Sequence, residues 1–240
     1  MMNTIIVIPT LDESDNIPKL FNALKVLKKI NYKICFVDGS KDNRTINEIK
    51  KYFKNNSKIL KEKKNISKIS SRCAASRMGF EWAVKQKFCE LIVDMDCDLA
   101  NDPNDIIYAI KLFKKKNYDL IITSKYLPKS SVNGRTIFRS FLSKFYTVVC
   151  QIFINKNISD YSNSYRFYKK KYLKKMLKKP LVFKSPIQHL ENLKFFILNN
   201  YKIGQIHTNY NQLRGGKSVI KLKHLIIYFY EFVICLTKKK

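Results

Sequence analysis

Apolar runs and amphipathic segments alternate along the first half of the chain. Residues 4–8 and 32–37 are continuous apolar, β-branched runs that end in polar loops, as expected of strands buried on both faces. Between them, apolar residues recur at helical spacing over residues 17–27. This order of strand, helix and strand predicts a parallel sheet, whose functional loops gather at the carboxyl ends of the strands.

The same alternation continues to about residue 124. It predicts a weak strand at 59–60, a helix at 73–83, a strand at 91–93, a helix at 103–114 and a strand at 119–124. We therefore expect an α/β protein with a mostly parallel central sheet flanked by helices. Residues 1–220 should form one large domain, and residues 221–240 a basic, apolar C-terminal helix.

Three aspartates follow the apolar run at 91–93. Asp94, Asp96 and Asp98 recur at period two, so an extended strand would place them on one face. Carboxylates this close repel one another unless a cation lies between them, and oxygen ligands suit a divalent metal. The alternative is a set of solvated turn acids, because residues 101–103 read Asn-Asp-Pro, an ordinary turn sequence.

The chain carries a formal charge of +29 that is distributed unevenly. Residues 1–120 hold 23 basic and 15 acidic side chains, whereas residues 121–240 hold 24 and 3. Such a field attracts phosphates, whether on nucleotides, on nucleic acid or on an anionic membrane surface. Lysine supplies 40 of the 47 basic residues, so a compositional bias accounts for part of the charge but not for the difference between the halves.

The six cysteines form no C-x-x-C pair, and no histidine lies at metal-ligand spacing from them. This argues against a zinc site and favours a reducing, cytoplasmic compartment. The apolar run near the N-terminus is too short for a signal peptide, so we expect the protein to stay inside the cell.

An ordered set of motifs carries a family resemblance. The set comprises Pro9-Thr10-Leu11-Asp12-Glu13, Val37-Asp38-Gly39-Ser40-Lys41-Asp42, the helix from Arg72 to Phe80, Asp96-Cys97-Asp98-Leu99 with Pro103, Ser124-Lys125-Tyr126, Arg139, the segment from Ser159 to Arg166, and Arg214-Gly215-Gly216-Lys217-Ser218. In order and spacing it resembles family 2 glycosyltransferases, and within them the polyprenyl (dolichol) phosphate mannosyltransferases and their bacterial relatives. The resemblance covers about residues 3–220, and it rests on the ordered set because no single motif is specific.

The resemblance implies a GT-A (Rossmann-like) fold, a nucleotide-sugar donor and a divalent cation, Mg²⁺ or Mn²⁺. Asp96 and Asp98 would bind the cation, which bridges the donor diphosphate, and Asp98 would coordinate it directly. Ala100 stands where close relatives often carry a polar residue, so water or phosphate would complete the coordination.

The resemblance also assigns residues to the donor. Those expected to bind the nucleotide sugar are Pro9, Thr10, Leu11, Glu13, Asp38, Arg72, Asp96 and Cys97. Asp38 would hydrogen-bond the base or the ribose, and Arg72 would reach the base or the phosphates. The alternatives are helix capping by Glu13 and Asp38 and a solvated helix charge at Arg72.

Four basic residues would complete an anion pocket under the same resemblance: Lys125, Arg139, Arg214 and Lys217. Lys125 would contact the diphosphate or the acceptor as a point charge. Arg214 and Lys217 would lie on a glycine-containing loop that closes over the donor. Surface charge in a lysine-rich protein is the alternative for each of them.

The chemistry of the acceptor decides the mechanism. A sugar hydroxyl needs a general base, whereas a lipid phosphate is already an anionic nucleophile that basic residues hold. Residues 121–240 contain only three carboxylates, which favours a phosphate acceptor. Glu191 or His189 remains a candidate base, against the alternative of an acid that stabilises a helix N-terminus. We expect in-line displacement with inversion at the anomeric carbon.

Two segments, 138–154 and 225–236, are rich in apolar and aromatic residues. The second is too short to cross a bilayer, and both are typical of helices that lie at a membrane interface. Packing against the core is the alternative, equally favoured for the second segment and more favoured for the first.

These inferences converge on a metal-dependent, inverting glycosyltransferase peripherally associated with the cytoplasmic face of a membrane. It would move a hexose, in the first instance mannose from GDP-mannose, onto a polyprenyl phosphate. The first alternative is a relative that uses a UDP-sugar or glycosylates a hydroxyl of a cell-surface polysaccharide. A nucleic-acid-binding protein is a remote alternative, because the chain has no recognition motif and the acid cluster would repel a polyanion.

Overall fold

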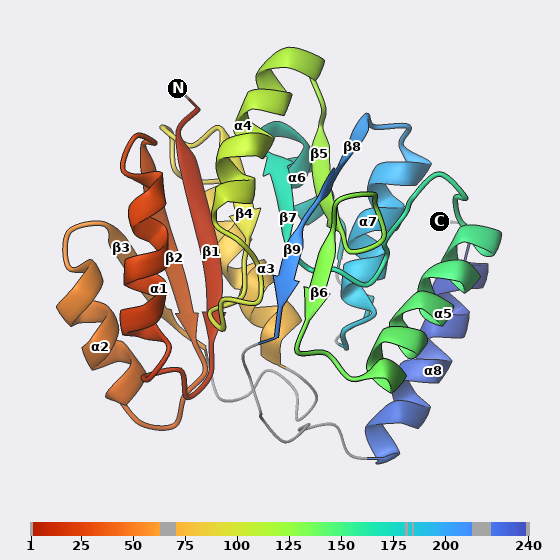
Figure 1. Ribbon diagram of the computed structural model, residues 1–240, viewed down its shortest axis with the longest axis horizontal. Coiled ribbons are helices and arrows are strands. Elements are labelled where there is room, and N and C mark those ends of the chain that lie inside the picture. Colours follow the sequence, from red (N-terminus) through yellow and green to blue (C-terminus); the bar gives the residue numbers. More distant parts are fainter. Residues whose placement is uncertain (1, 63–70, 181, 184, 213–221, 239–240) are drawn as a thin grey trace.

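Strands and helices alternate in the computed structural model, which describes residues 2–62, 71–180, 182–183, 185–212 and 222–238 (Figure 1). The first half contains β1 (Thr4–Thr10), α1 (Ile17–Leu24), a 3₁₀ turn (Lys25–Leu27), β2 (Tyr32–Asp38), α2 (Arg44–Phe53), β3 (Ser57–Lys61), α3 (Ser71–Ala83), β4 (Leu91–Asp94), α4 (Asn104–Lys116) and β5 (Leu120–Ser124). The second half contains β6 (Ser131–Asn133), α5 (Ile137–Phe153), β7 (Arg166–Lys169), α6 (Lys170–Leu177), α7 (Gln188–Leu198), β8 (Ile203–His207), β9 (Asn209–Asn211) and α8 (Leu222–Thr237).

The central sheet has seven strands in the order β3-β2-β1-β4-β7-β5-β8. Neighbouring strands run parallel except at β7, which is antiparallel to both β4 and β5. A separate two-stranded sheet pairs β6 with β9. The mostly parallel α/β sheet predicted from the sequence is therefore confirmed.

Helices cover both faces of this sheet, because successive residues of a strand point to opposite faces. In β1, Ile5 and Val7 join one apolar cluster together with residues of α3, α6 and α7. Ile6 and Ile8 join a second cluster together with residues of α1, α2 and α4. Burial on both faces explains why β1 reads as a continuous apolar run. It also holds the carboxyl ends of β1, β2 and β4 at one edge of the sheet.

The expected arrangement of the three aspartates is wrong beyond Asp94. Strand β4 ends at Asp94, and Asp96 and Asp98 lie in the irregular segment that follows. Leu99 then adopts a positive φ of 59° as the chain turns toward α4. The period of two is lost because the backbone leaves the sheet, so the three carboxylates do not share one strand face.

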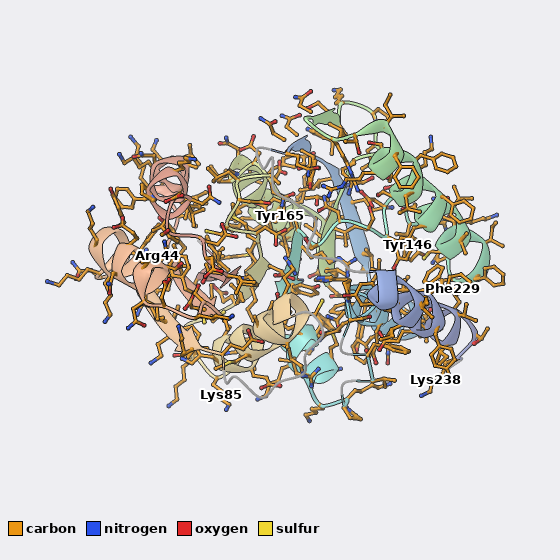
Figure 2. The ribbon with its side chains drawn as sticks, turned by 90° about the horizontal axis from the view of Figure 1, so that it is seen from below. Arg44, Lys85, Tyr146, Tyr165, Phe229 and Lys238 are labelled. Carbon is orange, nitrogen blue, oxygen red and sulfur yellow. The ribbon has the colours of Figure 1, made fainter. Side chains whose placement is uncertain are left out.

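Helices α5 and α8 pack against each other at one end of the molecule (Figure 1). The rings of Tyr146 and Phe232 lie with centroids 4.9 Å apart, and Figure 2 shows Tyr146 beside the junction of the two helices. Lys194 of α7 donates through Nζ to the carbonyls of Cys235 and Lys238 at 2.5 and 2.7 Å. This ammonium therefore caps the C-terminal end of α8 and ties it to the body of the protein.

The outward side of this helix pair is apolar. Its exposed apolar residues are Ile137, Phe138, Phe141, Leu142, Phe145, Val148, Ile152 and Phe153 on α5, and Ile226, Ile227, Phe229, Tyr230 and Val233 on α8. We call this surface the α5/α8 apolar face. Within the described part of the chain, no helix has both the length and the apolar character needed to cross a membrane. Each helix thus buries one side against the protein and exposes an apolar side.

A glycine sets the distance between α3 and the sheet. A Cβ atom at Gly79 would lie 2.3 Å from Val7 Cγ1 and 3.2 Å from Val37 Cγ2. Both valines are buried in the sheet, so neither can move away without disturbing its neighbours. The close approach therefore sets how near α3 lies to β1 and β2, and the first turn of the helix reaches the carboxyl end of β4 through Arg72.

We expect Gly79→Ala to destabilise the protein. Overpacking of a core costs about 1–3 kcal/mol, which exceeds the gain of up to about 1 kcal/mol in helix propensity. Urea unfolding would measure the change in the free energy of unfolding, with Glu81→Ala on the exposed side of α3 as the control. A stability equal to or above that of the unmodified protein would contradict the close packing of α3 on β1.

Candidate functional site

A cavity of about 250 Å³ lies beside the carboxyl ends of β1 and β4. Its lining residues are Pro9, Thr10, Leu11, Glu13, Glu62, Arg72, Ala75, Asp96, Cys97 and Asp98. We call it the carboxylate cavity. It brings together seven of the residues that the sequence assigns to the donor and both of those assigned to the metal.

Arg72, in the first turn of α3, pairs with two of the aspartates. Its Nε donates to Asp96 Oδ1 at 2.6 Å, and its Nη1 and Nη2 each lie 3.4 Å from an oxygen of Asp94. Ser76 Oγ donates to Asp94 Oδ1, and Ser164 Oγ donates to Asp96 Oδ2, both at 3.0 Å. Arg72 is therefore not the solvated helix charge that was the alternative expectation.

Burial and charge act together on the ionisation of this group. Burial raises the pKa of Asp94 above its ordinary value, although the charge of Arg72 opposes the rise. Burial alone would lower the pKa of Arg72, but Asp94 and Asp96 raise it above its ordinary value. The guanidinium therefore stays charged and supplies the cation that these carboxylates need.

His189, at the start of α7, approaches Arg72 from another side. Its Nε2 lies 2.9 Å from Arg72 Nη1, and its Nδ1 has no hydrogen-bond partner among the described residues. Burial lowers the pKa of His189 well below its ordinary value, and the charges of Arg72 and Arg166 act in the same direction. Because a guanidinium can only donate, the neutral imidazole accepts at Nε2 and carries its proton on Nδ1.

Asp38 lies behind the wall of the carboxylate cavity and does not line it. It is fully buried, and it accepts hydrogen bonds from Thr10 Oγ1 at 3.1 Å, Ser40 Oγ at 2.6 Å and Lys61 Nζ at 2.8 Å. The sequence predicts that Asp38 hydrogen-bonds the base or the ribose of the donor, but in the structure its carboxylate already accepts hydrogen bonds from these protein groups. In this arrangement Asp38 positions Thr10, which does line the cavity.

The surroundings of Asp96 and Asp98 fit a divalent cation in chemistry. Both offer carboxylate oxygens to the carboxylate cavity, and hard cations prefer such ligands. Asp98 Oδ1 accepts from the amide of Ala100 at 3.1 Å. Among the described residues, no group of three Asp, Glu, His or Cys side chains is placed to hold a metal. A cation bound here would therefore need oxygens from a diphosphate or from water as well.

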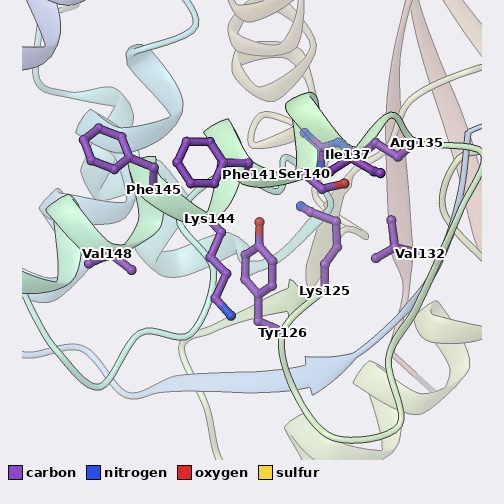
Figure 3. Close-up of a pocket in the computed structure, with 10 residues that line it drawn as sticks. All are labelled: Lys125, Tyr126, Val132, Arg135, Ile137, Ser140, Phe141, Lys144, Phe145 and Val148. Atoms are coloured by element: carbon purple, nitrogen blue, oxygen red, sulfur yellow. The ribbon is translucent and has the colours of Figure 1, made fainter.

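A second cavity, of about 580 Å³, lies beside α5 (Figure 3). It is lined by the basic residues Lys125, Arg135 and Lys144, by the apolar residues Val132, Ile137, Phe141, Phe145 and Val148, and by Tyr126 and Ser140. We call it the basic cavity. No carboxylate of the described residues contributes to its lining, so it combines a cationic wall with an apolar one.

Lys125 is held in a buried ion pair, which changes its expected role as a free point charge. Its Nζ lies 2.9 Å from Asp160 Oδ2 and donates to Ser162 Oγ at 3.1 Å. Burial lowers the pKa of Lys125 in spite of Asp160. Burial alone would raise the pKa of Asp160, but Lys125 and the hydrogen bonds that Asp160 accepts hold it below its ordinary value. Among the described residues, Arg135 and Lys144 have no carboxylate within ion-pair distance.

Tyr210 of β9 lies beside two basic residues of the basic cavity. Lys125 Nζ and Arg135 Cζ lie 5.5 and 5.8 Å from the centroid of its ring. Burial raises the pKa of Tyr210, the charge of Asp98 adds to the rise, and the charges of Arg135 and Arg139 oppose it. The acidic side chains of one cavity and the basic side chains around the other therefore act on the same phenol ring.

The remaining predicted residues lie elsewhere or outside the described chain. Arg139, in the first turn of α5, is half-buried on the side of Tyr210. Glu191, in the first turn of α7, accepts a hydrogen bond from the amide of Phe183 at 3.4 Å and lines a different cavity. It is not brought to the carboxylate or basic cavity, where a general base would be needed. Arg214 and Lys217 lie outside the described residues.

Some residues of the site are not foreseen from the sequence. Ser164, which holds Asp96, belongs to the segment from Ser159 to Arg166, so the resemblance marked the segment but not the residue. Arg166 is fully buried and donates through Nη1 to the carbonyl of His189 at 2.6 Å. Tyr210 and Glu62 carry no local signal, because their relation to the aspartates exists only in the folded chain.

Comparison with solved structures defines the class of fold. The chain matches the glucosyl-3-phosphoglycerate synthase of Mycobacterium tuberculosis, solved with Mn²⁺, UDP-glucose and phosphoglyceric acid, with a TM-score of 0.66 and 11% identity over 99% of this chain and 79% of that one. It matches TarS 1–349 of S. aureus with a TM-score of 0.61 and 19% identity over 88% and 60% of the two chains. These likenesses show an α/β fold of the GT-A kind.

The sequence places the chain within a family. The sequence model described as Glycosyl transferase family 2 matches residues 5–177, so the chain belongs to the family 2 glycosyltransferases. The expected enzyme class is thereby confirmed.

Relatives with assigned functions include polyprenyl-phosphate sugar transferases. The chain is 25% identical over 230 residues to the dolichol-phosphate mannosyltransferase of Pyrococcus furiosus, which covers 95% of this chain and 62% of that protein. It is 24% identical over 241 residues to the undecaprenyl-phosphate 4-deoxy-4-formamido-L-arabinose transferase of Yersinia pestis, covering 97% and 67%. An uncharacterized glycosyltransferase of Synechocystis is 31% identical over 164 residues, covering 65% and 48%. The chain thus spans about half to two thirds of the length of these relatives.

We expect Asp160→Ala to destabilise the protein by about 3–5 kcal/mol, because it leaves the buried ammonium of Lys125 without its counter-ion. Replacing both residues, Lys125→Met with Asp160→Leu, should recover most of this loss. Urea unfolding at neutral pH would measure both changes. Because the folded state lowers the pKa of Asp160, its contribution is complete at neutral pH and declines as the pH falls through the lowered pKa. Equal losses in the single and double variants would contradict a paired, buried charge.

Proposed function

We propose that this chain transfers a hexose from a nucleotide sugar to a polyprenyl phosphate, with inversion at the anomeric carbon. The first choice of donor is GDP-mannose. The observation that carries the proposal is the presence of two unlike cavities, one lined in part by carboxylates and the other by basic and apolar side chains. The first suits a metal-bound diphosphate, and the second suits a phosphate attached to an apolar chain.

The carboxylate cavity would receive the donor. Pro9, Thr10 and Leu11 lie at the carboxyl end of β1. Nucleotides bind at this end of the strands in open α/β sheets. Asp96 and Asp98 would hold a divalent cation, and the chemistry that it would supply is stabilisation of the charge developing on the leaving nucleotide. Ser164 Oγ donates to Asp96 Oδ2, which holds this carboxylate at the cavity.

The basic cavity would receive the acceptor. A phosphate monoester is already anionic, so no proton has to be removed before one of its oxygens attacks the anomeric carbon. The bond from that carbon to the diphosphate breaks as the new bond forms, and the nucleoside diphosphate leaves. Arg135 and Lys144 carry the positive charge for the phosphate, since the charge of Lys125 is balanced by Asp160. The lack of a carboxylate in the lining supports this acceptor over a sugar hydroxyl.

The α5/α8 apolar face would hold the enzyme at the cytoplasmic surface of a membrane. Phe141 and Phe145 belong both to this face and to the lining of the basic cavity. An acceptor phosphate could therefore bind while its lipid tail stays in the bilayer. The net charge of +29 would add attraction to anionic lipids. The relatives from Pyrococcus furiosus and Yersinia pestis, both named for polyprenyl-phosphate substrates, support the choice of acceptor.

We expect the purified chain to convert polyprenyl phosphate to its hexosyl ester when Mn²⁺ or Mg²⁺ is present. A panel of donors, including GDP-mannose and UDP-glucose, would identify the nucleotide and the sugar. Asp98→Asn should lower the transfer rate about 100-fold or more, because the charge of the leaving diphosphate loses its stabilisation. Thin-layer separation of labelled lipid would measure the product.

The control for this variant is Asp102→Asn, which changes a carboxylate of the same loop that does not line the cavity. It should transfer at close to the rate of the unmodified enzyme. Transfer at full rate by Asp98→Asn, or no transfer to polyprenyl phosphate from any donor, would reject the proposal. Labelled RNA serves as a competitor, and tight binding of RNA without any transfer would favour the nucleic-acid alternative.

We expect the double variant Phe138→Asp with Phe229→Asp to bind anionic lipid vesicles at least about tenfold more weakly. Each phenylalanine is about 70% exposed, and burial of such a side chain is worth about 1.5–3 kcal/mol. Co-sedimentation with phosphatidylglycerol vesicles would measure the change. The control, Val26→Asp with Tyr108→Asp, adds the same charge at exposed apolar residues outside the α5/α8 apolar face. Equal binding by both double variants would remove this face from the proposal.

A further inference from the structure

We propose that Arg72 is an internal competitor of the metal: its guanidinium occupies Asp96 until a nucleoside diphosphate and a divalent cation arrive together. The inference rests on the proposed function, because it assumes that Asp96 is a metal ligand. The observation behind it is the contact of 2.6 Å between Arg72 Nε and Asp96 Oδ1 inside the carboxylate cavity. A guanidinium bonded to this oxygen repels a divalent cation at the same carboxylate, so the two cations compete for Asp96.

The geometry allows Arg72 to release Asp96 without leaving a buried charge unpaired. Asp94 is 1% exposed, and Arg72 contacts both of its oxygens at 3.4 Å. Arg72 Nη1 also lies 2.9 Å from His189 Nε2 and donates to Ser76 Oγ at 3.3 Å. If Asp96 binds a cation instead, the guanidinium of Arg72 still has Asp94, Ser76 and His189 as partners. Asp96, in contrast, is 30% exposed and lies where a ligand can reach it.

The exchange couples the binding of metal and donor. In the donor-free enzyme a cation must displace Arg72 from Asp96, so the affinity for metal is low. A nucleoside diphosphate brings oxygen ligands for the cation and a second anion for the guanidinium, so it lowers the cost of the displacement. By thermodynamic linkage, the metal raises the affinity for the nucleotide by the same factor. Arg72 would therefore keep the carboxylate cavity from being filled by metal alone.

The test measures free Mn²⁺ by electron paramagnetic resonance in titrations without sugar donor or acceptor. We expect Arg72→Gln to bind Mn²⁺ about tenfold or more tightly than the unmodified protein, because the charged hydrogen bond that competes with the metal for Asp96 is removed. Arg77→Gln is the matched control: it removes the same charge from the same helix, where Arg77 contacts Glu81 and the carbonyls of Leu177 and Lys179. It should bind Mn²⁺ as the unmodified protein does.

A second variant covers the case in which Arg72→Gln leaves Asp94 uncompensated and fails to fold. The double variant Arg72→Gln with Asp94→Asn keeps the net charge of the protein and removes the buried carboxylate together with its partner. It should still bind Mn²⁺ more tightly than the unmodified protein. With GDP or UDP present, the gain in Mn²⁺ affinity should be larger for the unmodified protein than for either Arg72 variant.

The outcomes separate this inference from the proposed function. Unchanged or weaker Mn²⁺ binding by both Arg72 variants, in a protein that binds Mn²⁺ with GDP or UDP, would overturn the competitor role alone. Mn²⁺ binding by the Arg72 variants but not by the unmodified protein, even with nucleotide, would overturn the release of Asp96 on donor binding and also the metal dependence of the proposed function. A failure of every form to bind Mn²⁺ would overturn both.

Discussion

The carboxylates at the end of β4 impose the strictest constraint on this protein. Asp94 is almost completely buried, and an ionised group in that position is stable only with a cation beside it. Arg72 provides the cation, and it can do so because Gly79 lets α3 lie directly against β1. The fold and the electrostatics of the site therefore depend on each other. The close packing of α3 places the guanidinium of Arg72, and this guanidinium stabilises the carboxylates of Asp94 and Asp96.

The positions of the three carboxylates in residues 121–240 explain how the uneven charge of the sequence is distributed in the structure. Asp160 forms an ion pair with Lys125, Glu191 lines a separate cavity beside α7, and Glu231 lies on α8. None of them lines the basic cavity, whose positive charge is carried by Arg135 and Lys144. The acids of the carboxylate cavity, Glu13, Glu62, Asp96 and Asp98, follow β1, β3 and β4. The linings of the two cavities thus differ in the sign of their charge.

The sequence predicts most of the fold because the signals for it are local. Continuous apolar runs mark strands buried on both faces, and parallel strands bring their carboxyl ends to one edge, so Pro9 to Glu13 and the aspartates could be placed together. The partners of each side chain are set by contacts between distant segments, and local patterns do not report them. The sequence assigns Asp38 to a ligand, but its carboxylate accepts hydrogen bonds from Thr10, Ser40 and Lys61. It assigns Lys125 the role of a free charge, but this residue pairs with Asp160. The turn after Asp94 is missed for the same reason.

Helix α5 belongs both to the wall of the basic cavity and to the α5/α8 apolar face. The helix supplies Phe141 and Phe145 to the wall of the basic cavity, and the same residues continue into the exposed α5/α8 apolar face. A nucleic-acid duplex would meet the cations, but its charged backbone would gain little from this apolar wall, and a polysaccharide hydroxyl would lack the negative charge that the cations select. A phosphate joined to a hydrocarbon chain satisfies both surfaces at once, because its head balances Arg135 and Lys144 while its tail follows the helix outward. This continuity of a charged cavity with an apolar surface, rather than the total charge of the protein, favours a lipid phosphate as the acceptor.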